Sequence, residues 1–122
     1  MTHKILVVDD SATIRQQAGM FLRSKGFEVV EAQDGQQGYE KAQSEDVALM
    51  LVDVNMPVMN GIEMIGKVRQ LDKHAKTPIF MVTTESSKAK VQEGKAAGAT
   101  AWMVKPFNPD LLMKAITKVL GL

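Results

Sequence analysis

Short apolar runs alternate five times with longer stretches in which apolar residues recur at helical spacing, and this alternation constrains the fold more than any other feature. The runs are rich in β-branched residues, and they lie at about 4 to 8, 27 to 32, 47 to 52, 78 to 83 and 100 to 104. Each stretch between them is long enough for a helix. The sequence therefore predicts five repeats of a strand followed by a helix.

Three of the predicted strands are apolar at every position, over residues 5–8, 47–52 and 79–82. A strand with one face in water alternates apolar and polar residues, whereas a parallel strand covered by helices on both faces stays apolar throughout. The expected fold is therefore an α/β domain built on an open, doubly wound parallel sheet.

Length and charge narrow the class of protein further. A chain of 122 residues fits one domain, residues 1–122, with one hydrophobic core. The 15 basic and 14 acidic residues are mixed along the chain, which gives no basic surface for nucleic acid. There is no cysteine for disulfides or thiolate chemistry. No apolar run reaches the length of a signal peptide or a membrane span, so we expect a cytoplasmic protein that binds neither nucleic acid nor membrane.

Charged or hydroxyl side chains stand at the carboxyl ends of four predicted strands. Asp9 and Asp10 follow the first strand, and Asp53 follows the third. Thr83 ends the fourth strand, and Lys105 follows the fifth. In an open α/β sheet the ligand site lies beyond the carboxyl ends of the strands. We therefore expect these five side chains to form one site.

Carboxylates gathered at that edge would repel one another unless a cation joins them. Mg²⁺ is the expected ion, because it takes oxygen ligands and is commonly held by one or two carboxylates together with a phosphate. Asp10 and Asp53 would be direct ligands, and Asp9 would act mainly through a bound water. The backbone carbonyl of Asn55 could supply a further oxygen.

Lys105 and the Thr83 hydroxyl would bind an anion beside this metal, an arrangement that suits a phosphoryl group. Asp53 is then the expected nucleophile, because an ionised carboxylate accepts a phosphoryl group as an acyl phosphate without a general base. Lys105 would neutralise the charge on the phosphoryl oxygens.

In this order on a fivefold strand and helix pattern, Asp9-Asp10, Asp53, Thr83 and Lys105-Pro106 resemble the receiver domain of two-component response regulators. The resemblance covers essentially the whole chain and implies a (βα)5 sheet with the flavodoxin-like strand order 2-1-3-4-5. It implies that Asp53 takes its phosphoryl group from a phosphohistidine of a sensor histidine kinase, with Mg²⁺ as cofactor and no turnover of a separate substrate. The Lys105–Pro106 bond is usually cis in this family.

The resemblance also implies a switch. Phosphorylation would draw Thr83 toward the phosphoryl oxygens, and Trp102, at the family's aromatic position on the fifth strand, would turn inward behind it. The surface formed by the fourth helix, fifth strand and fifth helix would then exchange partners. The sequence ends just after the fifth helix, so the expected output is protein binding by a stand-alone regulator.

Among stand-alone receivers, the chain resembles chemotaxis regulators of the CheY type. The segments that carry this resemblance are Ala96-Ala97-Gly98-Ala99, Trp102 to Phe107, and Lys88 at the start of the fourth helix. Asn55 and Glu85 resemble a pair found in chemotaxis regulators that lose their phosphoryl group quickly. The implied partners are a sensor kinase, a downstream protein such as a flagellar motor switch component, and a phosphatase. The family's aromatic is most often tyrosine, whose hydroxyl is missing here, so the downstream target could differ.

Several alternatives stay open at this point. A stand-alone receiver could act as a phosphate sink or relay outside chemotaxis. A haloacid-dehalogenase-type phosphatase also uses an Asp nucleophile and Mg²⁺, but Asn55 replaces its acid/base aspartate. A flavodoxin-like FMN binder would need a phosphate loop where Asp9-Asp10 stand. The chain could also be an unphosphorylated interaction module. Independently of that, Asp9 could simply cap the first helix, and Trp102 could be a structural aromatic.

Overall fold

Strands and helices alternate along the chain from β1 to α5 in the structure, a computed structural model that describes residues 3–106 and 108–122. Phe107, part of the segment that resembles chemotaxis regulators, lies outside the described residues. The strands are β1 (Lys4–Val8), β2 (Glu28–Ala32), β3 (Leu49–Val52), β4 (Ile79–Thr83) and β5 (Ala101–Val104). The helices are α1 (Ala12–Ser24), α2 (Gly35–Ser44), α3 (Gly61–Val68), the short 3-10 helix η1 (Asp72–His74), α4 (Lys88–Ala97) and α5 (Pro109–Leu120).

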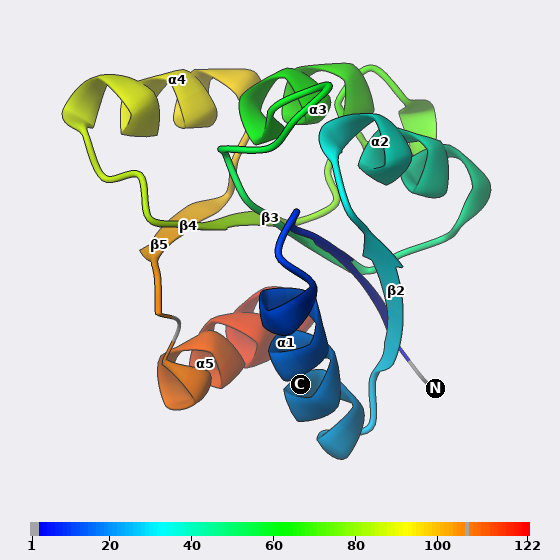
Figure 1. Cartoon of the computed structure of the whole chain (residues 1–122). Coiled ribbons are helices and arrows are strands. Elements are labelled where there is room, and N and C mark those ends of the chain that lie inside the picture. Colours follow the sequence, from blue (N-terminus) through cyan, green and yellow to red (C-terminus); the bar gives the residue numbers. More distant parts are fainter. Residues whose placement is uncertain (1–2, 107) are drawn as a thin grey trace.

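All strand pairs are parallel, and the sheet has the order β2-β1-β3-β4-β5. This confirms the predicted fold class and the strand order that the family resemblance implied. In Figure 1, α2, α3 and α4 cover one face of the sheet, while α1 and α5 cover the other. None of the helices in the described ranges is long and apolar enough to cross a membrane.

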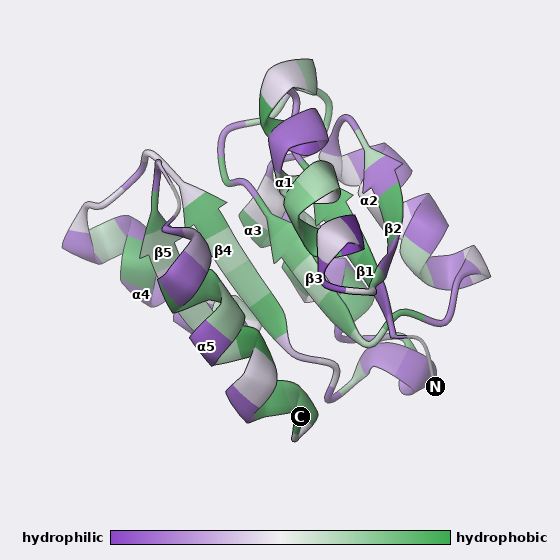
Figure 2. Cartoon of the chain, turned by 90° about the horizontal axis from the view of Figure 1, so that it is seen from below, coloured by the Kyte–Doolittle hydropathy of each residue, from purple (hydrophilic) through white to green (hydrophobic). Residues whose placement is uncertain are grey.

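Alternate residues of each central strand enter different cores, because successive side chains of a strand point to opposite faces. Leu6 and Val8 pack on the side of α2 and α3, whereas Ile5 and Val7 pack on the side of α1 and α5. The green colour that runs along β3 and β4 in Figure 2 reflects the same arrangement. Burial on both faces explains why these runs are apolar at every position.

Four strands begin one or two residues later than predicted. For β2 and β3 the reason is that an apolar residue can be buried without joining the strand ladder. Phe27 is buried, but its N–H donates to the Leu22 carbonyl at 3.1 Å and closes the turn after α1. Val47 is also buried, although β3 begins only at Leu49.

The loop between β3 and α3 is held tightly against the end of β3. The Gly61 N–H donates to the Val54 carbonyl at 3.0 Å, and a Cβ at Gly61 would collide with the Asp53 carbonyl group. Asn60 caps α3, since its Oδ1 accepts a hydrogen bond from the Glu63 N–H at 2.9 Å. This loop therefore fixes the backbone immediately after Asp53.

Val58 in the same loop has a φ of 70°, a left-handed conformation that is unfavourable for a β-branched residue. Val58 is 82% exposed, so little burial offsets the cost. We expect Val58→Gly to raise the free energy of unfolding by about 1 kcal/mol, measured by urea denaturation. Val58→Ala keeps a Cβ at positive φ and should gain little. Equal gains from both substitutions would show that backbone strain is not the cause.

Candidate functional site

The backbone hydrogen bonding of the sheet continues one residue beyond several strands, and the predicted site residues occupy these positions. The Asp9 N–H donates to the carbonyl of Ala32, the last residue of β2, at 3.1 Å. The Asp53 N–H donates to the carbonyl of Val8, the last residue of β1, at 3.0 Å. The Lys105 N–H donates to the carbonyl of Thr83, the last residue of β4, at 2.8 Å. Each backbone is therefore fixed by a neighbouring strand while its side chain lies at the carboxyl edge of the sheet.

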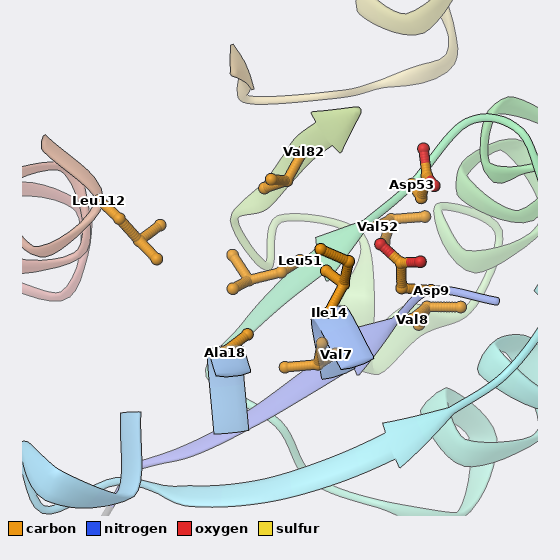
Figure 3. A pocket seen from close by; sticks show the side chains of 10 residues that line it. All are labelled: Val7, Val8, Asp9, Ile14, Ala18, Leu51, Val52, Asp53, Val82 and Leu112. Carbon is orange, nitrogen blue, oxygen red and sulfur yellow. The ribbon is translucent and has the colours of Figure 1, made fainter. Parts of the chain in front are cut away.

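Three carboxylates meet at this edge. Asp9, Asp10 and Asp53 each offer an oxygen atom, and these oxygens lie within 4.8 Å of one another. Asp9 and Asp53 are buried, whereas Asp10 is exposed to solvent. Figure 3 shows the carboxylates of Asp9 and Asp53 at the ends of adjacent strands, beside a small cavity whose other lining residues are apolar. The predicted acidic cluster is thus present and has one open side.

Lys105 lies between the two buried carboxylates. Its Nζ donates to Asp9 Oδ2 at 2.6 Å and to Asp53 Oδ2 at 3.0 Å, and its side chain is only 12% exposed. The second oxygen of Asp53, Oδ1, is buried and has no hydrogen-bond partner within the described residues. Burying a carboxylate oxygen without a partner costs free energy, so this atom points to a ligand of the site.

Burial and pairing act in opposite directions on the charges of this site. Burial raises the pKa of the Asp9 carboxyl above its ordinary value, although hydrogen bonds from Lys105 and Ser11 oppose the shift. Burial alone would lower the pKa of the Lys105 ammonium, but its hydrogen bonds to Asp9 and Asp53 outweigh this effect and leave its pKa raised. The ammonium form of Lys105 is therefore stabilised by the two carboxylates.

Replacing Lys105 by methionine should cost about 3 kcal/mol of stability at neutral pH, because two buried carboxylates lose their cation. A raised folded-state pKa stabilises the fold below the ordinary value of 10.5, and this contribution is lost as pH rises through the folded-state value. The difference in unfolding free energy between wild type and Lys105→Met should therefore shrink above pH 10.5. Urea denaturation in EDTA measures it, and a difference independent of pH would contradict the pairing.

Two residues that hold Asp9 were not anticipated from the sequence. The Ser11 N–H donates to Asp9 Oδ1 at 2.9 Å, and Arg15 Nη1 donates to the Asp9 carbonyl at 2.6 Å. Ser11 itself caps α1 by accepting a hydrogen bond from the Ile14 N–H, so the suggestion that Asp9 caps this helix is wrong. Serine is a preferred N-cap residue, so the sequence does offer a signal for the capping role of Ser11. Arg15 carries no such signal, because its contact depends on the turn between β1 and α1.

A second group of predicted residues is linked at the edge formed by β4 and β5. Thr83 is fully buried, and its Oγ1 accepts a hydrogen bond from the Glu85 N–H at 3.2 Å. The Glu85 carbonyl in turn accepts a hydrogen bond from the Trp102 indole N–H at 2.8 Å. The half-buried indole packs against the core on the α3 and α4 side, so it lies inward in this structure.

Two of the remaining predicted positions are exposed to solvent. Asn55 is exposed in the loop after β3, two residues beyond Asp53. Lys88 is the first residue of α4, as expected, and is also exposed. The Lys105–Pro106 bond is cis, which agrees with the family resemblance.

Residues 5–117 match the family model described as the response regulator receiver domain. The chain therefore belongs to the response regulator receiver family. It is 42% identical over 120 residues to a chemotaxis protein CheY homolog of Campylobacter jejuni, a match that covers 97% of this chain and 92% of the relative. Within the family, it is a CheY-like receiver domain.

Solved structures agree with this assignment. Chemotaxis protein CheY4 of Vibrio cholerae matches with a TM-score of 0.92 and 48% identity, covering 98% of this chain and 99% of that one. The receiver domain of sensor histidine kinase PA1611 from Pseudomonas aeruginosa, with a magnesium ion coordinated in its active site cleft, shares the fold at a TM-score of 0.92 and 24% identity, with full coverage of both chains.

Proposed function

We propose that this chain is a phosphorylation-switched response regulator in which Asp53 accepts the phosphoryl group. The observation that carries the proposal is the state of the Asp53 carboxylate. One of its oxygens is bonded to Lys105, while the other is buried without a partner beside Asp9 and Asp10. Such a carboxylate is fixed in place, is kept next to a cation, and has an oxygen atom available for reaction.

In the proposed reaction, an Asp53 oxygen attacks the phosphorus of a phosphohistidine on a sensor kinase. The bond between phosphorus and the imidazole nitrogen breaks, the nitrogen keeps the electron pair, and Asp53 becomes an acyl phosphate. Lys105, already within hydrogen-bond distance of Asp53, balances charge on the phosphoryl oxygens. Water later attacks the phosphorus, which releases inorganic phosphate and restores the carboxylate. No separate substrate is turned over in this scheme.

Asp10 and Asp53 would hold Mg²⁺ directly, with Asp9 acting through water and the Asn55 carbonyl adding an oxygen. The described residues fit such an ion, because three carboxylate oxygens converge within 4.8 Å and one Asp53 oxygen lacks a partner. When bound, the ion would neutralise the charge shared by carboxylate and phosphoryl oxygens. The magnesium ion in the PA1611 receiver domain supports the choice of metal.

We propose that the signal leaves the site through Thr83. A phosphoryl oxygen on Asp53 would accept a hydrogen bond from the Thr83 hydroxyl. Drawing the hydroxyl toward the phosphoryl group would disturb the bond that its oxygen now accepts from the Glu85 N–H. The same residue is bonded to Trp102, so a change at Thr83 would reach the surface formed by α4, β5 and α5. Asn55 and Glu85 would tune how quickly the phosphoryl group is lost.

The proposed localisation of this protein is the cytoplasm. Its proposed partners are a sensor histidine kinase, a downstream protein such as a flagellar motor switch component, and a phosphatase. Similarity to chemotaxis proteins over nearly the whole chain supports a role in chemotaxis. The mixed surface charge gives no support for a role in binding nucleic acid.

A small phosphodonor tests the proposed function without knowledge of the kinase. Incubation with acetyl phosphate and Mg²⁺ should add one phosphoryl group, detected by intact mass, and the adduct should decay once the donor is removed. EDTA should prevent labelling. No adduct in the presence of donor and Mg²⁺ would contradict the proposal and favour a constitutive binding module.

A further inference from the structure

Gly94 and Trp102 share a space that cannot hold both an indole and another side chain. Gly94 is the buried residue of α4, and Trp102 faces it from β5. A Cβ added to Gly94 would lie 2.6 Å from Cζ3 of the indole and 3.1 Å from Cε3. Packed carbon atoms lie about 3.5 to 4.0 Å apart, so the six-membered ring of Trp102 occupies the place of a side chain at position 94.

A glycine inside a helix needs a reason, because it is about 1 kcal/mol less favourable than alanine there. Gly94 lies in the last turn of α4, four residues before the cap residue Gly98, and has ordinary helical backbone rather than the positive φ that favours glycine. Its backbone conformation therefore gives no reason for glycine, whereas close approach of the Trp102 ring does. Gly66 in α3 is a useful contrast, since an added Cβ there would meet nothing within 4 Å.

The position of the indole matters because hydrogen bonds link Trp102 to Thr83, the residue proposed to contact the phosphoryl group. The indole N–H donates to the Glu85 carbonyl at 2.8 Å, and the Glu85 N–H donates to the Thr83 hydroxyl at 3.2 Å. To accommodate a Cβ at position 94, the ring would have to move by roughly 1 Å. Trp102 is half-buried on the edge strand, so solvent is the open direction, and that movement would break the bond to Glu85.

We propose that Gly94 is a positioning residue whose missing side chain admits the Trp102 indole against α4. The size of the residue at position 94 thereby sets the balance between inward and outward orientations of Trp102. It also sets the geometry of the loop that follows Thr83. The second part rests on the proposed function, in which Thr83 and Trp102 transmit phosphorylation. The first part depends only on packing.

Trp102 is the single tryptophan of the chain, so its fluorescence reports the indole directly. Gly94→Ala should shift the emission to longer wavelength and increase quenching by acrylamide, because the ring moves toward water. Gly66→Ala is the matched control and should leave both properties unchanged. Wild-type emission and quenching in Gly94→Ala would overturn the proposal.

Stability provides a second test that does not need the fluorophore. Gly66→Ala should raise the thermal midpoint by a few degrees, as expected for a better helix former, whereas Gly94→Ala should lower it. In a Trp102→Leu background, which removes the ring, Gly94→Ala should become stabilising. A double-mutant cycle measures this reversal. Equal effects of Gly94→Ala in both backgrounds would overturn the proposal even if one variant fluoresces weakly.

Phosphorylation then tests the link to Thr83. With acetyl phosphate and Mg²⁺, Gly94→Ala should be labelled several-fold more slowly than wild type, and Gly66→Ala should be labelled normally. An indole that moves without any change in labelling would overturn the link to the Thr83 loop. If wild type takes up no phosphoryl group, the proposed function fails, while fluorescence and stability still decide whether Gly94 positions Trp102.

Discussion

Asp53→Asn is expected to take up no phosphoryl group under conditions in which wild type takes up one. An amide has no negative charge, and its nitrogen lone pair is delocalised, so it cannot replace the carboxylate as nucleophile. The substitution preserves the shape of a buried side chain, and Lys105 keeps its 2.6 Å contact with Asp9. Loss of labelling would then reflect chemistry at residue 53. Intact mass after incubation with acetyl phosphate and Mg²⁺ gives the result.

Asp34→Asn provides a matched control at the same edge of the sheet. Asp34 caps α2, with its Oδ1 accepting a hydrogen bond from the Gln37 N–H at 2.8 Å, and asparagine caps helices about equally well. This variant should be labelled like wild type, and both variants should retain the far-UV circular dichroism of the folded chain. Labelling of Asp53→Asn at the wild-type rate would place the phosphoacceptor elsewhere.

The second large effect is expected from Asp10→Asn, which should weaken Mg²⁺ binding about tenfold or more, because ligand charge governs the affinity for a hard cation. Asp10 is the exposed member of the acidic cluster, so its loss should leave the stability of the metal-free fold nearly unchanged. Isothermal titration calorimetry measures the affinity. Labelling by acetyl phosphate should fall at low Mg²⁺ and recover at high Mg²⁺.

A carboxylate outside the cluster separates a specific ligand from a general effect of charge. Asp46 has a 94% exposed side chain and lies before β3, away from the carboxyl edge of the sheet. Asp46→Asn removes the same charge and should bind Mg²⁺ like wild type. Equal losses of affinity in the two variants would show that Asp10 is not a ligand.

Much of the fold could be predicted from the sequence, because burial of a parallel strand on both faces leaves an unbroken apolar run. The runs 5–8 and 79–82 show this directly, and the observed sheet has the predicted parallel strands. Strand beginnings were less predictable. Val47 is apolar because it is buried, but the ladder that defines β3 starts two residues later.

The approximate location of the site followed from a topological rule, since side chains after parallel strands gather at one edge. Asp9, Asp10, Asp53 and Lys105 are found together there. The detailed bonding was not predictable. That Lys105 binds both buried carboxylates depends on how side chains far apart in sequence are oriented, which no local pattern encodes.

The contacts that were missed join residues closer in sequence, but they too depend on tertiary geometry rather than on a local pattern. Arg15 reaches the Asp9 carbonyl through the turn that opens α1, and Gly94 meets Trp102 only because α4 packs over β5. A helix-interior glycine could be noticed in the sequence, but its partner could not be identified from spacing. The left-handed backbone at Val58 had no signal at all, since valine is a poor residue for that conformation.

The most direct test of the central claim is to locate the phosphoryl group. An acyl phosphate is reduced by borohydride to an alcohol, so a labelled aspartate becomes homoserine, which peptide mass spectrometry identifies at its position in the chain. After incubation with acetyl phosphate and Mg²⁺, homoserine should appear at position 53, and EDTA should prevent it. Homoserine at position 9 or 10, or a phosphoryl group on a hydroxyl or imidazole, would contradict the assignment of Asp53 as phosphoacceptor.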